Sequence, residues 1–251
     1  MDFIPTSLIK SRSTVFSEII SNLANLSISQ GFFLLKFKLA QVTPLLKKPG
    51  LDKNTPSNYR PISKLNNIHK LLEHLILSRI QYNTTSSCNL NTFQSSYRRY
   101  YSTESALLLA LDNIYHVSDE SSSMVFISLN VSAAFNTIDH IILLSQLQIS
   151  FGISGLALAW FQSYLEGAVS LSVLAVTHLQ QLCAPRVFRK DLTLVLCFFS
   201  LFISPIAHIV NSYGPLQQQY ADDAQLYVAI SKDNYDNPVA KLELCLSTLH
   251  T

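Results

Sequence analysis

The 251-residue sequence has few charged residues: Asp, Glu, Lys and Arg make up only 14% of it, and the net charge is +2. A field this weak does not by itself argue for nucleic-acid binding, so local clusters must carry any such interaction. Hydrophobic residues make up 48%, which is ample for a packed core and excludes a disordered tail. The length allows one domain or a domain and a half.

Cysteine is also scarce. The residues Cys88, Cys183, Cys197 and Cys245 are widely spaced with no CxxC pair, which argues against a zinc site and a disulfide framework. The start of the chain has neither the basic head nor the apolar run of a signal peptide. We therefore expect an intracellular, reducing environment, in the cytoplasm or the nucleus.

One apolar run, residues 192–210, has the length and hydrophobicity of a membrane span. Pro205 and His208 interrupt it, and no aromatic belt or strong basic cluster flanks it. These features favour a buried helix that breaks near Pro205. A membrane-associated protein is kept as an alternative.

Apolar periodicity alternates between helical and strand-like stretches along the chain, with no internal repeat. Helices are predicted at residues 15–26, within 62–80, and at 103–117, 139–147, 156–165 and 239–249. Strands are predicted at residues 39–46 and 124–129, and a hairpin at residues 216–230. This pattern predicts an α+β fold with an antiparallel sheet covered by helices.

The predicted hairpin has two adjacent carboxylates, Asp222 and Asp223, at its tip. Taken alone, such a pair is usually a solvated turn. Placed between two apolar strands, it can also present acid to a metal ion. The best candidate for a neighbouring strand, residues 124–129, is followed by Asn130 where a third carboxylate would complete the site.

Four motifs occur in order along the chain: Asn58 to Ser63, Gln94 to Arg99 with Ser102 to Glu104, Leu129 to His140, and Tyr220 to Asp223. Together they resemble the reverse transcriptase of non-LTR (LINE-type) retrotransposons, over nearly the whole chain. The resemblance implies polymerase fingers at residues 1–120 and a palm with an antiparallel sheet at 121–251, with the thumb absent. It also implies an RNA template, a DNA primer and deoxynucleoside triphosphates as partners.

The chemistry that the resemblance implies is phosphoryl transfer with two Mg²⁺ ions about 4 Å apart. By the motif, Asp222 and Asp223 are the metal-binding, catalytic carboxylates, and Asn130 occupies the position of the third. Phe135 matches the aromatic that excludes a 2′ hydroxyl from the nucleotide site. Arg60, Arg98 and Arg99 match basic residues that meet triphosphate or template backbone. Without the resemblance, Phe135 is more simply a core residue and the arginines are surface charges.

Two departures predict an impaired enzyme. Asn130 has no charge and is a poor bridge between divalent cations, so a loss of roughly 4 to 6 kcal/mol would slow the reaction about a thousand- to ten-thousandfold. Asn136 also replaces an aspartate that is usual in the family. Asp139 does not substitute for Asn130, because it should cap the following helix and face elsewhere.

The second departure is a missing loop, Gly-Val-Pro-Gln-Gly-Ser, replaced by Val187 to Leu192. These six residues can be encoded GTG TTC CGC AAG GAT CTG, and one more G in front makes the same bases spell the missing motif. We hypothesise that this segment is translated out of the ancestral frame, which residues 201–205 restore. Around residues 179–199 we therefore expect poor packing and exposed apolar surface. A further alternative is a non-catalytic nucleic-acid-binding protein that uses Lys47 and Lys48 with the three arginines.

Overall fold

The computed structural model describes residues 5–38, 40–96, 98, 100–120, 123–130, 138–166, 170–172, 193–221, 223–230 and 236–250. The chain divides into two compact units that interleave in sequence. The first contains residues 1–81 and 139–195, and the second contains residues 82–138 and 196–251. This division differs from sequential halves that meet at residue 120.

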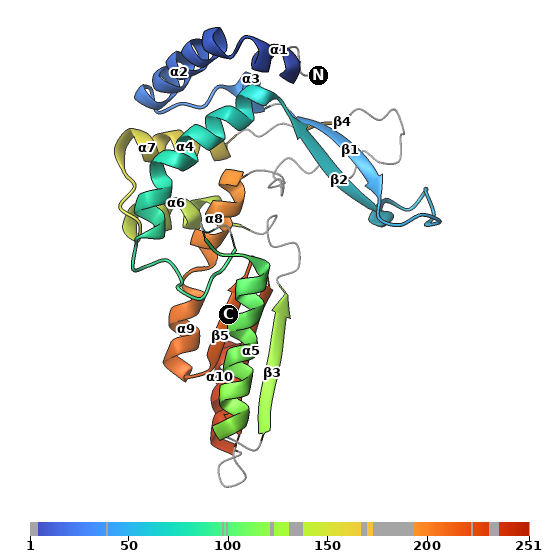
Figure 1. The fold of residues 1–251 in the computed structure, drawn as a ribbon, viewed down its shortest axis with the longest axis vertical. Helices are drawn as coiled ribbons and strands as arrows, with labels where there is room; N and C mark the ends of the chain where they lie inside the picture. The colour runs from blue at the N-terminus through green and yellow to red at the C-terminus, as the bar shows by residue number, and fades with distance from the viewer. Residues whose placement is uncertain are drawn as a thin grey trace. The chain divides into compact units, whose positions relative to one another are not determined.

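The first unit contains most of the N-terminal helices and a small sheet (Figure 1). Its elements are α1 (Thr6–Ser11), α2 (Ser13–Ser29), α3 (Leu35–Lys38), β1 (Ala40–Leu46), the 3₁₀ turn η1 (Pro56–Asn58), β2 (Tyr59–Leu65), most of α4 (Asn67–Thr85), α6 (His140–Ile149), α7 (Gly155–Leu165) and β4 (Ser170–Ser172). Strand β1 pairs antiparallel with β2 and parallel with β4, which gives the order β2-β1-β4.

Strand β2 was not predicted, because residues 52–60 indicated a turn-rich loop and residues 62–80 were expected to contain a helix. Its pairing with β1 places Pro61 opposite Pro44. The Lys47 amide donates to the Asn58 carbonyl, so the alternation of an antiparallel ladder makes Pro44 and Pro61 a pair without mutual hydrogen bonds. The two prolines lack a backbone N–H, but at these positions the N–H groups would not bond between β1 and β2, so no hydrogen bond between the strands is lost.

The core of the first unit is aromatic. Phe33 is fully buried, and its ring packs edge-on against Trp160 and Tyr164, each with ring centroids 5.2 Å away. The Trp160 indole donates a hydrogen bond to Ser27 Oγ at 2.9 Å, which satisfies its one polar group. These contacts fix α7 against α2 and the segment that follows it.

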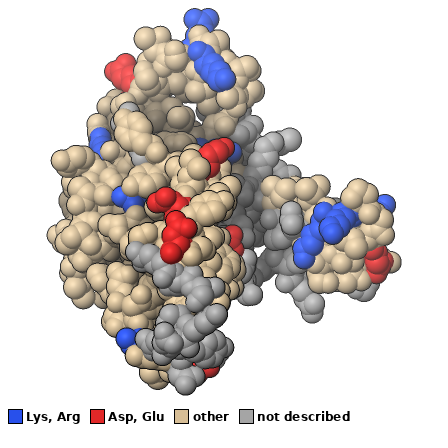
Figure 2. Space-filling view, turned by 60° about the horizontal axis from the view of Figure 1, so that its bottom comes forward, with Lys and Arg blue, Asp and Glu red and all other residues tan. Residues whose placement is uncertain are grey.

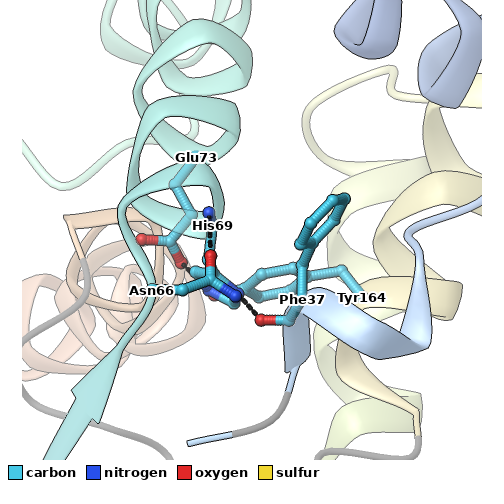
Figure 3. Close-up of polar contacts among 5 residues, drawn as sticks. All are labelled: Phe37, Asn66, His69, Glu73 and Tyr164. Carbon is cyan, nitrogen blue, oxygen red and sulfur yellow. Dashed lines mark hydrogen bonds and ion pairs between the residues drawn. The ribbon is translucent and has the colours of Figure 1, made fainter. Parts of the chain in front are cut away.

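A buried polar cluster lies beside these rings (Figure 3). His69 and Glu73 are adjacent on one face of α4, with His69 Nε2 3.3 Å from a Glu73 carboxylate oxygen. The Tyr164 hydroxyl donates to that carboxylate, and His69 Nδ1 lies 2.7 Å from the Phe37 carbonyl. Because a carbonyl only accepts, Nδ1 carries the proton. The cluster ties α4 to α3 and α7.

The second unit contains an antiparallel sheet of order β3-β6-β5. Its elements are α5 (Thr103–Glu120), β3 (Ser123–Asn130), the larger part of α8 (Thr193–Ile203), α9 (Ile206–Tyr213), β5 (Leu216–Tyr220), β6 (Asp223–Ile230) and α10 (Asp236–His250). The predicted hairpin and its neighbouring strand are confirmed, and so is the antiparallel pairing within an α+β fold.

Helices cover this sheet unequally. On one face, Leu226 packs with Val210 of α9 and with Leu242 and Cys245 of α10. Tyr227 points to the other face, where Asn113 of α5 lies at its hydroxyl; burial raises the pKa of this tyrosine. On the same face Phe126 of β3 stacks on Tyr227 yet is 45% exposed. The β3 side of this face is therefore partly exposed to solvent at Phe126.

The apolar run that could span a membrane forms α8 and α9, with the predicted break between Ile203 and Ile206. Leu194 to Tyr213 is long and apolar enough to cross a bilayer, but 56% of it is buried inside the protein, as in a core helix. Leu194, Phe198 and Phe199 are almost fully buried. The expectation of poor packing is therefore wrong for residues 194–199, and Val187 to Leu192 lies outside the described residues.

Candidate active site

The candidate site is the end of the β3-β6-β5 sheet at which three chemically distinctive positions meet. Asn130, the last residue of β3, is the register partner of Asp223, the first residue of β6. Asp223 is also the partner of Tyr220, the last residue of β5. The structure thus brings Asn130 and Asp223 together on one rung, as the motifs predict. The side chain of Asp223 is exposed to solvent.

Strand β5 ends at Tyr220 and β6 begins at Asp223, and Ala221, the first of the two residues between them, lies in a turn. Ala221 has φ 56°, in the left-handed region that non-glycine residues rarely adopt. Two-residue hairpin turns place positive φ at this position because that geometry matches the twist of the strands. For alanine the conformation costs on the order of 1 kcal/mol, so neighbouring contacts must hold it.

Those contacts come from the segment before α5. The backbone N–H of Gln219 in β5 donates to the backbone carbonyl of Phe93. The backbone N–H of Ser95 donates to the backbone carbonyl of Gln219, and both distances are 3.0 Å. Gln94 thereby forms a parallel bridge with Gln219. The bridge covers the free edge of β5 at Gln219. It places the motif that begins at Gln94 beside the motif that begins at Tyr220.

Arg98, predicted to bind nucleotide, forms hydrogen bonds within the segment that precedes α5. Its guanidinium donates to the carbonyls of Thr92 and Gln94 at 3.1 and 3.3 Å and lies 4.6 Å from the centre of the Tyr101 ring. Arg98 therefore supports the backbone that contacts the turn. The Ser102 hydroxyl accepts a hydrogen bond from the Ser105 backbone amide and so caps α5.

The other predicted site residues are placed as follows. Arg60 lies in β2 of the first unit, opposite Leu45. Asp222, Phe135, Asn136 and Arg99 lie outside the described residues.

Asp139 caps α6, as predicted. Its carboxylate accepts hydrogen bonds from the amides of Ile141 and Ile142 at 2.7 and 3.1 Å. A carboxylate engaged at a helix N-terminus satisfies two of the free amides there. The Asp139 carboxylate is therefore engaged in capping α6.

Among the described residues there is no group of three His, Cys, Asp or Glu side chains that could hold a metal ion. The described part of the site offers one exposed carboxylate, Asp223, with an asparagine as its partner on the neighbouring strand. Carboxylate and amide oxygens are both ligands of Mg²⁺, but only the carboxylate supplies charge. One described carboxylate does not by itself define a metal site.

Comparison with known proteins shows the class to which this fold and site belong. Residues 46–250 match the family described as reverse transcriptase (RNA-dependent DNA polymerase). The chain belongs to this family. The resemblance to a reverse transcriptase domain of a retrotransposon is thereby confirmed.

Two relatives from Drosophila melanogaster are similar to the chain. One, named a probable RNA-directed DNA polymerase from transposon BS, is 26% identical over 228 residues, which cover 87% of this chain and 24% of that protein. The other, named a probable RNA-directed DNA polymerase from transposon X-element, is 29% identical over 136 residues, which cover 54% of this chain and 15% of that protein. The matches thus span a quarter or less of each relative.

Proposed function

We propose that this chain is an RNA-directed DNA polymerase domain whose catalysis is impaired by the asparagine at residue 130. The observation that carries the proposal is the register of β3 and β6, which pairs Asn130 with Asp223. The interleaved units suggest the division of labour: the second, with the acidic hairpin, acts as palm, and the first acts as fingers. RNA template, DNA primer and deoxynucleoside triphosphates are the partners of such a domain.

In this proposal Asp222 and Asp223 hold the metal and Asn130 contributes a neutral oxygen. Two Mg²⁺ ions, when bound, supply the charge that activates the primer hydroxyl and stabilises the leaving pyrophosphate. Asp223 begins β6 and is paired on both sides, so its backbone is fixed at the sheet end. The neutral Asn130 weakens retention of the metals, which is the physical origin of the impairment.

Primer extension by the purified chain on an RNA template, with Mg²⁺ or Mn²⁺, tests this function. We expect extension to be absent or slower than in an active relative by about a thousandfold or more. Asp222→Ala controls for a contaminating polymerase. Efficient extension that disappears in Asp222→Ala would show that the two aspartates suffice and that the impairment is wrong.

A second candidate function, binding of nucleic acid without synthesis, is favoured by the β1–β2 arm, which is the antiparallel pair of strands at residues 40–65 with the loop that joins them. Lys47, Lys48 and Lys53 are all exposed in the loop that joins these strands. Figure 2 shows basic side chains gathered on the arm with an acidic one beside them. Asp52 lies in this loop, and its carboxylate accepts from the Thr55 hydroxyl and the Asn54 amide, which lower its pKa. The acid therefore shapes the loop while the lysines face solvent.

A further inference from the structure

Gln94 is a completely buried polar side chain whose hydrogen bonds converge on one residue of the acidic turn. Its carbonyl oxygen Oε1 accepts from the Ala221 amide at 3.1 Å, and its Nε2 donates to the Ala221 carbonyl at 3.3 Å. A single side-chain amide thus bonds both backbone groups of Ala221. Only a side chain with a donor and an acceptor side by side can do this.

Ser96 completes the arrangement. Its hydroxyl accepts from the Ala221 amide at 2.8 Å and donates to Gln94 Oε1 at 2.7 Å. The Ser96 amide donates to the same Oε1 at 3.1 Å. Gln94 is therefore held in one orientation by its own loop, and it presents a fixed pair of polar atoms to the turn.

The residue held in this way is the one with left-handed backbone geometry. Ala221 lies between Tyr220 and Asp222, so its φ and ψ angles determine the direction in which the chain enters the acidic pair. Without the bonds from residues 94 and 96, alanine would favour a right-handed or extended conformation. A change at Ala221 would redirect the carboxylates that follow it.

We infer that Gln94 is a positioning residue for the metal-binding turn, and that it acts by fixing the backbone of Ala221. This inference deepens the proposed function and rests on it, because the turn matters for catalysis only if Asp222 and Asp223 bind metal. In this role Gln94 acts through the Ala221 backbone, not through a bond of its own to metal or substrate. Its effect should appear in metal affinity and in the order of the turn.

Gln94→Met tests the inference, because methionine fills a similar volume without either polar group. Hydrogen exchange reports the order of the turn at the Ala221 amide, and Mn²⁺ titration followed by electron paramagnetic resonance reports metal affinity. The titration is made in an Asn130→Asp background, where a third carboxylate is present. We expect Gln94→Met to speed exchange at Ala221 and to weaken Mn²⁺ binding by about tenfold, the scale of lost support around a metal ligand.

Gln217→Met is the matched control. Gln217 is an equally buried glutamine of β5, but its amide donates to the Ala207 carbonyl and Asn211 Oδ1 of α9. This variant should lose stability without a change in Ala221 exchange or Mn²⁺ affinity. If Gln217→Met weakened Mn²⁺ binding as much as Gln94→Met, general loosening would explain both and the positioning role would be wrong.

Ala221→Gly provides a rescue, since glycine adopts positive φ without strain. In Gln94→Met it should recover part of the lost Mn²⁺ affinity, and a failure to do so would contradict the mechanism through Ala221. Unchanged exchange at Ala221 in Gln94→Met would likewise overturn the inference. If the Asn130→Asp parent bound no Mn²⁺ while exchange still responded to Gln94→Met, the proposed metal site would be rejected, and the positioning role with it.

Discussion

Asn130, at the end of β3, and Asp223, at the start of β6, are register partners. Asp223 is also the register partner of Tyr220 at the end of β5. In the proposed function, this register makes residue 130 the position at which two-metal transfer would need a third negative ligand. The sheet that holds the site is intact, with one face packed on α9 and α10. The proposed metal chemistry and the packing of the sheet can therefore be tested separately.

Replacing Lys47 and Lys48 together with alanine should reduce the salt dependence of RNA binding. If each lysine meets one phosphate of a single strand, the slope of log affinity against log salt should become shallower by about 1.4. Fluorescence anisotropy with a labelled RNA over a range of salt measures it. The double variant Lys70→Ala and Lys241→Ala removes the same charge elsewhere, and an equal effect from it would indicate that net charge, not the β1–β2 arm, binds RNA.

Phe33→Ala should destabilise the first unit by about 3 to 5 kcal/mol, because it empties the space between Trp160, Tyr164 and His69. Urea unfolding followed by tryptophan fluorescence is suitable, since Trp160 is the one tryptophan of the sequence. Tyr82→Ala is the control, because Tyr82 is 78% exposed. A Phe33 variant as stable as the Tyr82 variant would show that the aromatic cluster does not form the core.

Lys38 predicts a pH dependence. Its amine donates to the carbonyls of Ser163 and Glu166; burial lowers its pKa, while the Glu166 charge raises it in part. The pKa of Lys38 in the folded protein lies below the ordinary value of 10.5. Between the folded pKa and 10.5 the unfolded chain binds more protons than the folded chain, so the free energy of unfolding rises with pH. The stability of the wild type relative to Lys38→Met should therefore increase as pH approaches 10.5. A difference that stays constant across this window would mean that the amine is not desolvated.

Asp139→Ala should cost about 0.5 to 2 kcal/mol of stability, because the amides of Ile141 and Ile142 lose their acceptor. Asp139→Asn keeps an accepting oxygen and should cost less. Thermal unfolding measures both. Since Asp139 is assigned to the helix cap, neither variant should change Mn²⁺ affinity, and a large loss of affinity would return Asp139 to the metal site.

Local sequence signals predicted much of this fold. The apolar segments on either side of the aspartate pair predicted the hairpin, and the capping residue Asp139 predicted the start of α6. Strand β2 was missed because its identity depends on pairing with a distant strand, which overrides the local preference of proline. The interleaved units depend on long-range contacts in the same way.

For the site, the motifs predicted the meeting of Asn130 and Asp223, but not the role of Gln94. The sequence shows glutamine in a polar stretch, and nothing in that stretch indicates burial. Only the pairing of residue 94 with β5 reveals that its amide reaches Ala221. The task of Arg98 was hidden for the same reason, because its acceptors are backbone carbonyls, which carry no sequence signature.

The central claim is that the charge missing at residue 130 weakens metal binding, and Mn²⁺ titration of the wild type, Asn130→Asp and Asn130→Ala tests it most directly. Unlike primer extension, this readout does not depend on the segment at residues 187–192. We predict that Asn130→Asp binds Mn²⁺ about tenfold or more tightly than the wild type, while Asn130→Ala binds no better than it. Equal affinities for all three proteins would contradict the claim, because residue 130 would then take no part in holding metal.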